Sequence, residues 1–484
     1  MRILYIDCDT LRADHLGCYG YGRDTSPNID SVSAEGVRFD NCCVSDAPCL
    51  PSRSSLFTGR FGIHTGVVNH GGEAADPFIE GYPSRLFRMG SDRLPWMSRL
   101  RHAGLHTVSV SPYAERHSAW WFYEGFSEMF NPGKGGMERA DEVNPIALDW
   151  IERNAKNDDW FLHVNYWDPH TPYRTPTEYG NPFEGEPIPE WYTEAIRRRH
   201  FDGYGPHSAQ EPMPHWNRDR HPRVPAQIAS MDDYRRWIDG YDVGIRYMDD
   251  HIGRLFDALK KQGVFEELVI IVSADHGESQ GEFNVYGDHQ TADQTVSRVP
   301  LVVRWPGVTS ARVDTALHYQ TDLSATVTEL VGGECSPRWD GRSFAQAFRR
   351  GKSAGRDHLV LSQCAWSCQR TVRFDNYMMI RTYHDGLKDL PPYMLFDVDG
   401  DPHETIDLVE DHPELVDRAM RLLEDWHTRM MASSINGTDP LQTVLKEGGP
   451  FHARETHLND YCKHLRETGR AHHAEALEAR HGRS

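Results

Sequence analysis

The sequence predicts an α/β protein built on a mostly parallel sheet, followed by a smaller antiparallel sheet. Through most of the chain, short apolar runs alternate with stretches of helical spacing, which is typical of a parallel sheet covered by helices on both faces. After Trp339 the pattern changes to alternating strands and one helix. We therefore predict a large domain over 1–355, a small domain with a four-stranded antiparallel sheet and a helix over 356–432, and a helical extension over 433–484.

Apolar runs that end in polar residues are predicted as the strands of the large sheet. They are Ile3–Ile6, Thr107–Val110, Phe161–Trp167, Leu268–Ser273 and Leu301–Trp305. In open α/β sheets, ligands bind outside the carboxyl ends of the strands, so we expect the functional site at that edge. Pro176–Met231 is rich in Pro, His, Arg and Trp and weakly periodic. We interpret it as an insertion that lines or covers the crevice, with a functionless surface excursion as the alternative.

Composition excludes several classes of partner. The 484 residues carry a formal charge of −20 that is spread along the chain, which argues against nucleic acid or an anionic membrane as the main partner. The apolar runs are far shorter than the roughly 20 residues of a membrane span. The chain opens directly on a strand, so we expect a cytoplasmic protein, or a periplasmic or secreted one only if a leader has been removed. The nine cysteines are expected to be reduced thiols.

The most specific string is Cys49-Leu50-Pro51-Ser52-Arg53. Proline is tolerated in the first turn of a helix, so Cys49 is predicted to lie at a helix start, where free backbone N–H groups bind anions. A buried or mildly reactive thiol is the alternative interpretation.

Together with Leu56-Phe57-Thr58-Gly59-Arg60, this string resembles the signature of the sulfatase family, in the alkaline phosphatase superfamily. Other strings resemble the family in the same order along residues 1–432, among them Asp9–Asp14, Ala274–Glu278, Arg298–Leu301 and Leu395–Asp397. The resemblance implies an alkaline-phosphatase-like large domain and hydrolysis of sulfate esters.

The resemblance also implies a reaction. A maturation enzyme would oxidise Cys49 to formylglycine, whose hydrated aldehyde attacks sulfur and then expels sulfate. Asp9, Asp275 and His276 would bind a divalent ion together with the modified Cys49; we favour calcium, with magnesium as the alternative, because hard cations prefer oxygen ligands. Arg53 would neutralise the sulfate, and His170 would protonate the leaving oxygen.

Several positions depart from the family pattern. Thr10 stands where many members have a second aspartate. Asp7, on the same strand face as Asp9, is expected to have a buried hydrogen-bonding role, with compensation for the missing carboxylate as the alternative. The family's Lys-X-His is missing, which leaves Tyr113, Arg116 and His117 as candidates for contact with the substrate.

His289 replaces a family lysine, so sulfate binding should be more sensitive to pH. Asn69 and His70, in a Gly-rich turn, are further candidates for substrate contact, with a plain turn as the alternative.

The substrate is expected to be a sulfated carbohydrate, such as a glycosaminoglycan or uronic-acid fragment. The reason is a set of aromatic and cationic residues, namely Trp120, Trp121, His215, Trp216 and Arg220, which suit a sugar face and extra anionic groups. A phosphonate monoester or phosphodiester hydrolase is one alternative, and a non-catalytic sulfated-glycan binding protein with an unmodified Cys49 is another. The polar extension is expected to be an arm or a subunit contact in a homo-oligomer.

Overall fold

The computed structural model describes residues 1–78, 94–351 and 355–482. These residues form an eight-stranded sheet in the order β12-β2-β11-β8-β1-β7-β5-β6. Its strands are β1 (Arg2–Cys8), β2 (Val37–Phe39), β5 (His106–Val110), β6 (Glu128–Phe130), β7 (Trp160–Tyr166), β8 (Val269–Ala274), β11 (Leu301–Arg304) and β12 (Arg312–Asp314). β1 lies parallel between β7 and β8, whereas β11 is antiparallel to β8 and to β2. The predicted mostly parallel sheet is thus confirmed.

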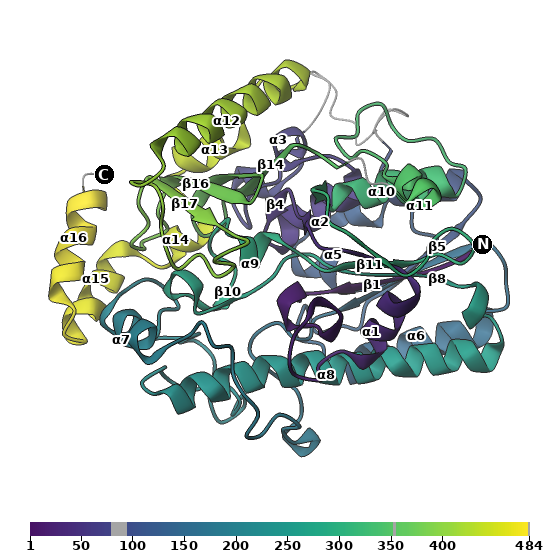
Figure 1. Ribbon diagram of the computed structural model, residues 1–484, viewed down its shortest axis with the longest axis horizontal. Helices are drawn as coiled ribbons and strands as arrows, with labels where there is room; N and C mark the ends of the chain where they lie inside the picture. The colour runs from purple at the N-terminus through teal and green to yellow at the C-terminus, as the bar shows by residue number, and fades with distance from the viewer. Residues whose placement is uncertain (79–93, 352–354, 483–484) are drawn as a thin grey trace.

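Helices cover both faces of this sheet (Figure 1). One layer contains α1 (Pro27–Glu35), α6 (Ala140–Asn154) and the long α8 (Met231–Gln262), and the other contains α2 (Cys49–Thr58), α4 (Trp96–His102) and α10 (Thr321–Leu330). Ser230 caps α8 by accepting a hydrogen bond from the backbone N–H of Asp233, which satisfies a donor at the helix start.

The second sheet contains the four antiparallel strands that the sequence predicts. They are β14 (His358–Gln363), β15 (Cys368–Phe374), β16 (Tyr377–His384) and β17 (Tyr393–Asp397), and α12 (Pro413–Ser433) packs against them. A further strand, β4 (Asp46–Ala47), lies parallel to β14, with Asp46 opposite Ser362. Sequence analysis missed β4 because two residues are too few for a periodic pattern. The segment that leads into α2 is therefore part of the small sheet.

Short elements complete the large domain. The helices are α3 (Gly62–Thr65), α5 (Tyr113–Arg116), α7 (Glu194–Asp202), α9 (Gln294–Ser297) and α11 (Ala345–Arg350). Two small ladders pair β3 (Cys42–Cys43) with β13 (His318–Tyr319), and β9 (Ser279–Gln280) with β10 (Tyr286–Asp288). The predicted boundary at 355 adjoins residues 352–354, which lie outside the described residues, and the three-part division stays a prediction.

The C-terminal extension is helical, as predicted. It contains α13 (Pro440–Lys446), α14 (Phe451–Glu455), α15 (Leu458–Glu467) and α16 (Ala471–His481). Its apolar side chains pack against the same chain: Tyr461, Leu465 and Leu477 are buried in one cluster with Tyr204 and Leu387. The extension therefore covers its own large domain (Figure 1), and the expected oligomer contact stays a prediction.

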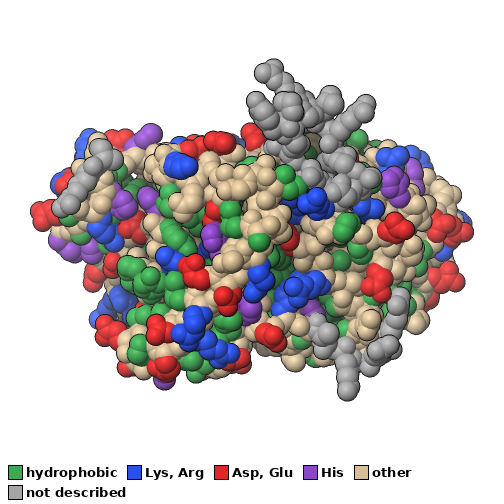
Figure 2. All heavy atoms as spheres, turned by 90° about the horizontal axis from the view of Figure 1, so that it is seen from above, with side chains coloured by type: hydrophobic (Ala, Val, Ile, Leu, Met, Phe, Trp, Pro, Cys, Tyr) green, Lys and Arg blue, Asp and Glu red, His purple; other side chains and the backbone are tan. Residues whose placement is uncertain are grey.

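Acidic and basic side chains are mixed over the face seen in Figure 2, so neither sign dominates it. Histidine side chains gather at the end of the molecule that the C-terminal helices occupy (Figure 2). Within the described ranges, no helix has the length and apolar character needed to cross a membrane. The nine cysteines, all in those ranges, are free thiols.

A buried lysine lies where the extension meets the large domain. Lys388 is 3% exposed and its Nζ donates a hydrogen bond to the carbonyl of Pro206 over 2.5 Å. Burial lowers its pKa to about 7, although Asp288, Glu211 and Asp385 act in the opposite direction. The folded protein therefore binds fewer protons than the unfolded chain between pH 7 and the ordinary lysine value of 10.5.

We predict that Lys388 makes the free energy of unfolding rise with pH above 7, by at most about 1.4 kcal/mol per pH unit. Lys388→Met should remove this contribution to the change of the free energy of unfolding with pH. Urea unfolding at pH 7 and at pH 9 measures that change. Lys463→Met, at an exposed position of α15, is the matched control and should keep the wild-type slope. Equal slopes in wild type and Lys388→Met would contradict the prediction.

Candidate active site

The carboxyl ends of three neighbouring strands place the candidate residues together. In the parallel register, Cys8 of β1 lies opposite Ala274 of β8 and Tyr166 of β7. The residue after Cys8 is Asp9 and the residue after Ala274 is Asp275, so the two carboxylates lie at the same height on the sheet edge. This is the edge at which the sequence predicts the site.

The guanidinium group of Arg53 contacts both of these carboxylates. It lies in α2, one turn after Cys49, and its side chain is 1% exposed. Its Nη1 lies 2.9 Å from Asp9 and 2.6 Å from Asp275, while its Nε donates to Asp7 over 2.9 Å. Asp7 also accepts from His163 (3.1 Å), which confirms its predicted buried hydrogen-bonding role.

Burial and Arg53 act on these acids in opposite directions. Burial alone would raise the pKa of Asp7, but Arg53 and His163 lower it to about 2. The pKa of Asp9 is lowered as well, since Arg53, His170 and His276 outweigh the effect of burial. For Asp275, burial dominates and raises the pKa well above its usual range. One cationic side chain thus does not hold all three acids in their charged form.

The free donor atoms at this edge fit a divalent cation. Asp9 Oδ1 and His276 Nε2 are buried and have no hydrogen-bond partner among the described residues. His276 Nδ1 lies 2.7 Å from the carbonyl of Gly277, so Nδ1 carries the proton and the Nε2 lone pair is free. Ligand atoms of Cys49, Asp275 and His276 lie within 4.8 Å of one another. The structure therefore brings together three of the four residues predicted to bind the metal, and Asp9 is linked to Asp275 through their shared contact with Arg53 Nη1.

Cys49 begins α2 and is 2% exposed. Its Sγ lies 3.4 Å from Nε2 of His70 and 3.4 Å from Nε2 of His117. Burial raises the pKa of the thiol, with Asp9 and Asp275 adding to the effect. An unmodified Cys49 is therefore a neutral thiol at physiological pH, which is a poor nucleophile.

Further histidines surround residue 49. The ring of His289 lies 4.2 Å from that of His276 and 5.9 Å from that of His170, measured between centroids. Desolvation lowers the pKa of His170 to about 4 and that of His289 well below its usual range. His170 Nδ1 donates to the carbonyl of Thr171, which leaves its Nε2 facing Asp9 at 4.0 Å. The predicted proton donor is thus neutral when no substrate is bound.

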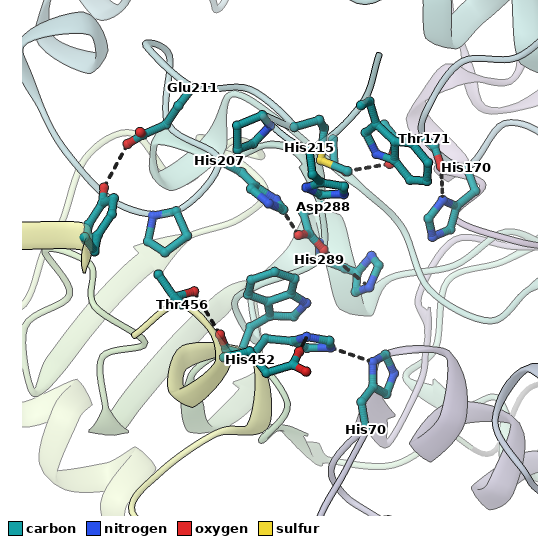
Figure 3. Close-up of a pocket in the computed structure, with 18 of the residues that line it drawn as sticks. His70, His170, Thr171, His207, Glu211, His215, Asp288, His289, His452 and Thr456 are labelled. Carbon is teal, nitrogen blue, oxygen red and sulfur yellow. Dashed lines mark hydrogen bonds and ion pairs between the residues drawn. The ribbon is translucent and has the colours of Figure 1, made fainter. Parts of the chain in front are cut away.

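A cavity of about 640 Å³ lies between His70, His170, His289 and His452 (Figure 3). Cys49, His70, Arg116, His170 and His289 line it, and the predicted insertion contributes Pro206, His207, Glu211, Met213, Pro214, His215 and Trp216. The insertion therefore does line the crevice.

Other lining residues were not singled out from the sequence: His207, Glu211, Asp288, Trp366, His452 and Tyr461. His207 and Glu211 lie in the predicted insertion, and Asp288 could have been found through its neighbour His289, whereas Trp366, His452 and Tyr461 come from segments with no local signal.

Two predicted substrate contacts have supporting positions instead. Tyr113 is fully buried, donates to the carbonyl of Leu50 over 3.1 Å and lies beneath Arg53. Asn69 is also fully buried, and its Oδ1 accepts from the backbone of His70 over 2.8 Å. Neither is among the described residues that line the cavity. Both side chains fix the segments that carry Cys49 and His70.

Part of the aromatic and basic set expected to contact a sugar also lies elsewhere. Trp216 and His215 line the cavity, whereas Trp120 is 60% exposed, and Trp120, Trp121 and Arg220 are not among its described lining residues.

Residues 2–333 match the model of the family described as Sulfatase. The chain belongs to the sulfatase family. It is a sulfuric ester hydrolase of the alkaline phosphatase superfamily.

Among its relatives, the N-acetylglucosamine-6-O-sulfatase of Bacteroides thetaiotaomicron is 21% identical over 92% of this chain and 89% of its own length. Human iduronate 2-sulfatase is 27% identical over 64% of this chain and 60% of its own length. The multifunctional alkaline phosphatase superfamily protein PehA of Trinickia caryophylli is 26% identical over 85% of this chain and 91% of its own length.

Solved structures share the fold of this sulfatase. A protein in complex with its substrate, D-glucosamine-2-N,6-O-disulfate, superposes with a TM-score of 0.70 at 17% identity, covering 91% of this chain and 99% of that one. The phosphonate monoester hydrolase of Silicibacter pomeroyi superposes with a TM-score of 0.67 at 20% identity, covering 92% and 97%. Because the sequence identities are this low, the two superpositions establish the fold alone, which is alkaline-phosphatase-like.

Arg53→Met should destabilise the protein most when no divalent cation is available. The substitution leaves three buried carboxylates without their guanidinium partner, which we expect to cost about 3–5 kcal/mol. Calcium should recover much of the lost stability, because the bound ion would compensate the negative charge of the carboxylates in place of Arg53. Thermal unfolding in EDTA and in calcium measures both effects. Arg153→Met, at an exposed ion pair, is the control and should change little. A loss that is the same in both buffers would argue against a cation at this site.

Proposed function

We propose that this sulfatase hydrolyses a sulfate ester of a carbohydrate and that Cys49 is converted to formylglycine by a maturation enzyme. One observation carries the proposal: Cys49 lies at the start of α2, with its Sγ close to Asp275 and His276, inside a cavity. A negatively charged group held there meets the free N–H groups of the helix start. The same position lies within reach of the atoms that could hold a divalent cation.

A divalent ion held by Asp9, Asp275, His276 and residue 49 would neutralise negative charge on the sulfate, and formylglycine would supply a nucleophilic oxygen. Calcium is our first choice because the predicted donors are mostly oxygens, with magnesium as the alternative. The residues of the chain would then orient the ester. His70 and His117 reach residue 49, and Arg116 adds a positive charge to the cavity wall.

The chemistry of the thiol supports the conversion. A buried Cys49 with a raised pKa gives little thiolate, so the unmodified side chain would attack sulfur slowly. His170 would donate its proton to the leaving oxygen only after the negative charge of the ester raises its pKa. Its orientation toward Asp9 is consistent with a position beside the scissile bond.

The cavity supports a small sulfated sugar. A volume of about 640 Å³ lies within the usual range of small-molecule sites, and Trp216 and Trp366 on its wall are suited to pack against a sugar face. Among the described lining residues, Arg116 is the one arginine, whereas Glu211, Asp288, Glu455 and Asp460 are acidic. We therefore propose a glycosaminoglycan or uronic-acid fragment whose other anionic groups lie outside this cavity.

A phosphonate monoester hydrolase is the second candidate. It is supported by the fold shared with the phosphonate monoester hydrolase of Silicibacter pomeroyi.

The deciding experiment combines mass spectrometry with kinetics. After co-expression with a formylglycine-generating enzyme, the peptide that contains residue 49 should show the mass of the aldehyde. The converted protein should then turn over 4-nitrophenyl sulfate faster than phenyl 4-nitrophenylphosphonate.

Cys49→Ala should lower kcat/KM for the sulfate by about a thousandfold or more, because the nucleophile is lost. The opposite preference would select the phosphonate hydrolase. A thiol that persists in a protein that still binds sulfated glycan would select the non-catalytic binding protein.

A further inference from the structure

The C-terminal extension reaches the residue at which the chemistry is proposed to occur. Helix α14 brings His452 to the cavity wall, where its Nε2 lies 3.0 Å from Nδ1 of His70 (Figure 3). The other nitrogen of His70, Nε2, lies 3.4 Å from Cys49 Sγ. A continuous chain of contacts therefore runs from the extension to residue 49.

We propose that His452 is a positioning residue that holds the imidazole of His70 against residue 49. The inference rests on the proposed function, since it assigns His70 to the reacting position. It makes the extension a part of the active site of its own chain.

His452 is itself held on several sides. Its backbone N–H donates to the carbonyl of Ala365 over 3.1 Å. Its ring stacks on Trp366 with the centroids 4.3 Å apart and an angle of 23° between the planes. Its Nδ1 lies 3.3 Å from a carboxylate oxygen of Glu455. A side chain fixed in this way can orient another, because it has few alternative positions to occupy.

The turn that carries His70 is shaped to receive the extension. A methyl group on Gly71 would collide with the ring of Phe451, and one on Gly72 would collide with the carboxylate of Glu447. Asn69 Oδ1 accepts from the backbone N–H groups of both His70 and Phe451. The turn that carries His70 is thus closely packed against the extension.

The direction of the hydrogen bonds follows from the chemistry of the groups. The carboxylate of Glu455 only accepts, so His452 Nδ1 donates to it. With one proton per ring, His452 Nε2 then accepts from the Nδ1–H of His70, and the Nε2 lone pair of His70 faces residue 49. In that orientation His70 can accept a hydrogen bond from a hydroxyl group at residue 49, which is what a hydrated aldehyde would offer.

Two variants separate the hydrogen bond from the packing. His452→Phe keeps a ring against Trp366 but removes the acceptor, whereas His452→Gln keeps an acceptor near the position of Nε2. With 4-nitrophenyl sulfate, we expect His452→Phe to lower kcat about ten- to a hundredfold with KM little changed, as for other residues that orient a catalytic group. His452→Gln should recover most of the loss. In crystal structures, the His70 ring should turn away from residue 49 in the Phe variant and keep its place in the Gln variant.

The control is His472→Phe, the same substitution at an exposed position of α16 outside this cavity, which should leave kcat and KM unchanged. Equal losses in the Phe and Gln variants, a change in KM alone, or an unmoved His70 ring in His452→Phe would overturn the proposal. If the converted wild type turns over no sulfate ester, the proposed function fails. The crystal structures still test the positioning role in that case, because they do not depend on activity.

Discussion

The contact between Arg53 and three buried aspartates is the interaction on which the rest of the site depends. Removing charged groups from water costs several kcal/mol each, so carboxylates at this edge of the sheet require a compensating charge. Arg53 provides part of that charge, because α2 begins at Cys49 and places residue 53 one helical turn later, beside the acids. The same geometry sets the distance between residue 49 and the atoms proposed to bind the metal. One helix therefore both contacts the acids and places the proposed nucleophile.

Around this anchor, each layer of the protein contributes a different kind of group. The parallel strands contribute acids, α2 contributes residue 49, and loops contribute histidines such as His170 and His289, whose desolvation keeps them neutral. A neutral cluster of imidazoles can donate or accept hydrogen bonds without repelling a metal ion. The site is therefore rich in groups that can adapt to an incoming anion, and its fixed charge is concentrated at the sheet edge that carries Asp9 and Asp275.

Sequence analysis predicted what is encoded locally. Asp9 and Asp275 follow apolar runs directly, so their place at the sheet edge could be read from the pattern, and the Cys49 string identified the family. The antiparallel direction of β11 and the short strand β4 depend on pairing with distant residues, which no local pattern records. His452 was missed for the same reason. Its hydrogen-bond partner His70 is 382 residues away along the chain, and its ring stacks on Trp366, which belongs to another segment. Tyr113 lies in the expected region, but only the structure shows that it supports α2 from behind.

The short strand β4 has a consequence for how the protein is made. Asp46 and Ala47 pair with Ser362 and Gln363, so the start of α2 is anchored by a strand that leaves the ribosome more than three hundred residues later. Such a distant pairing carries a large loop-closure entropy and forms slowly. Until then, the segment around residue 49 has no partner on that side. The surroundings of residue 49 therefore cannot be completed until β14 has been synthesised, although residue 49 itself is translated early.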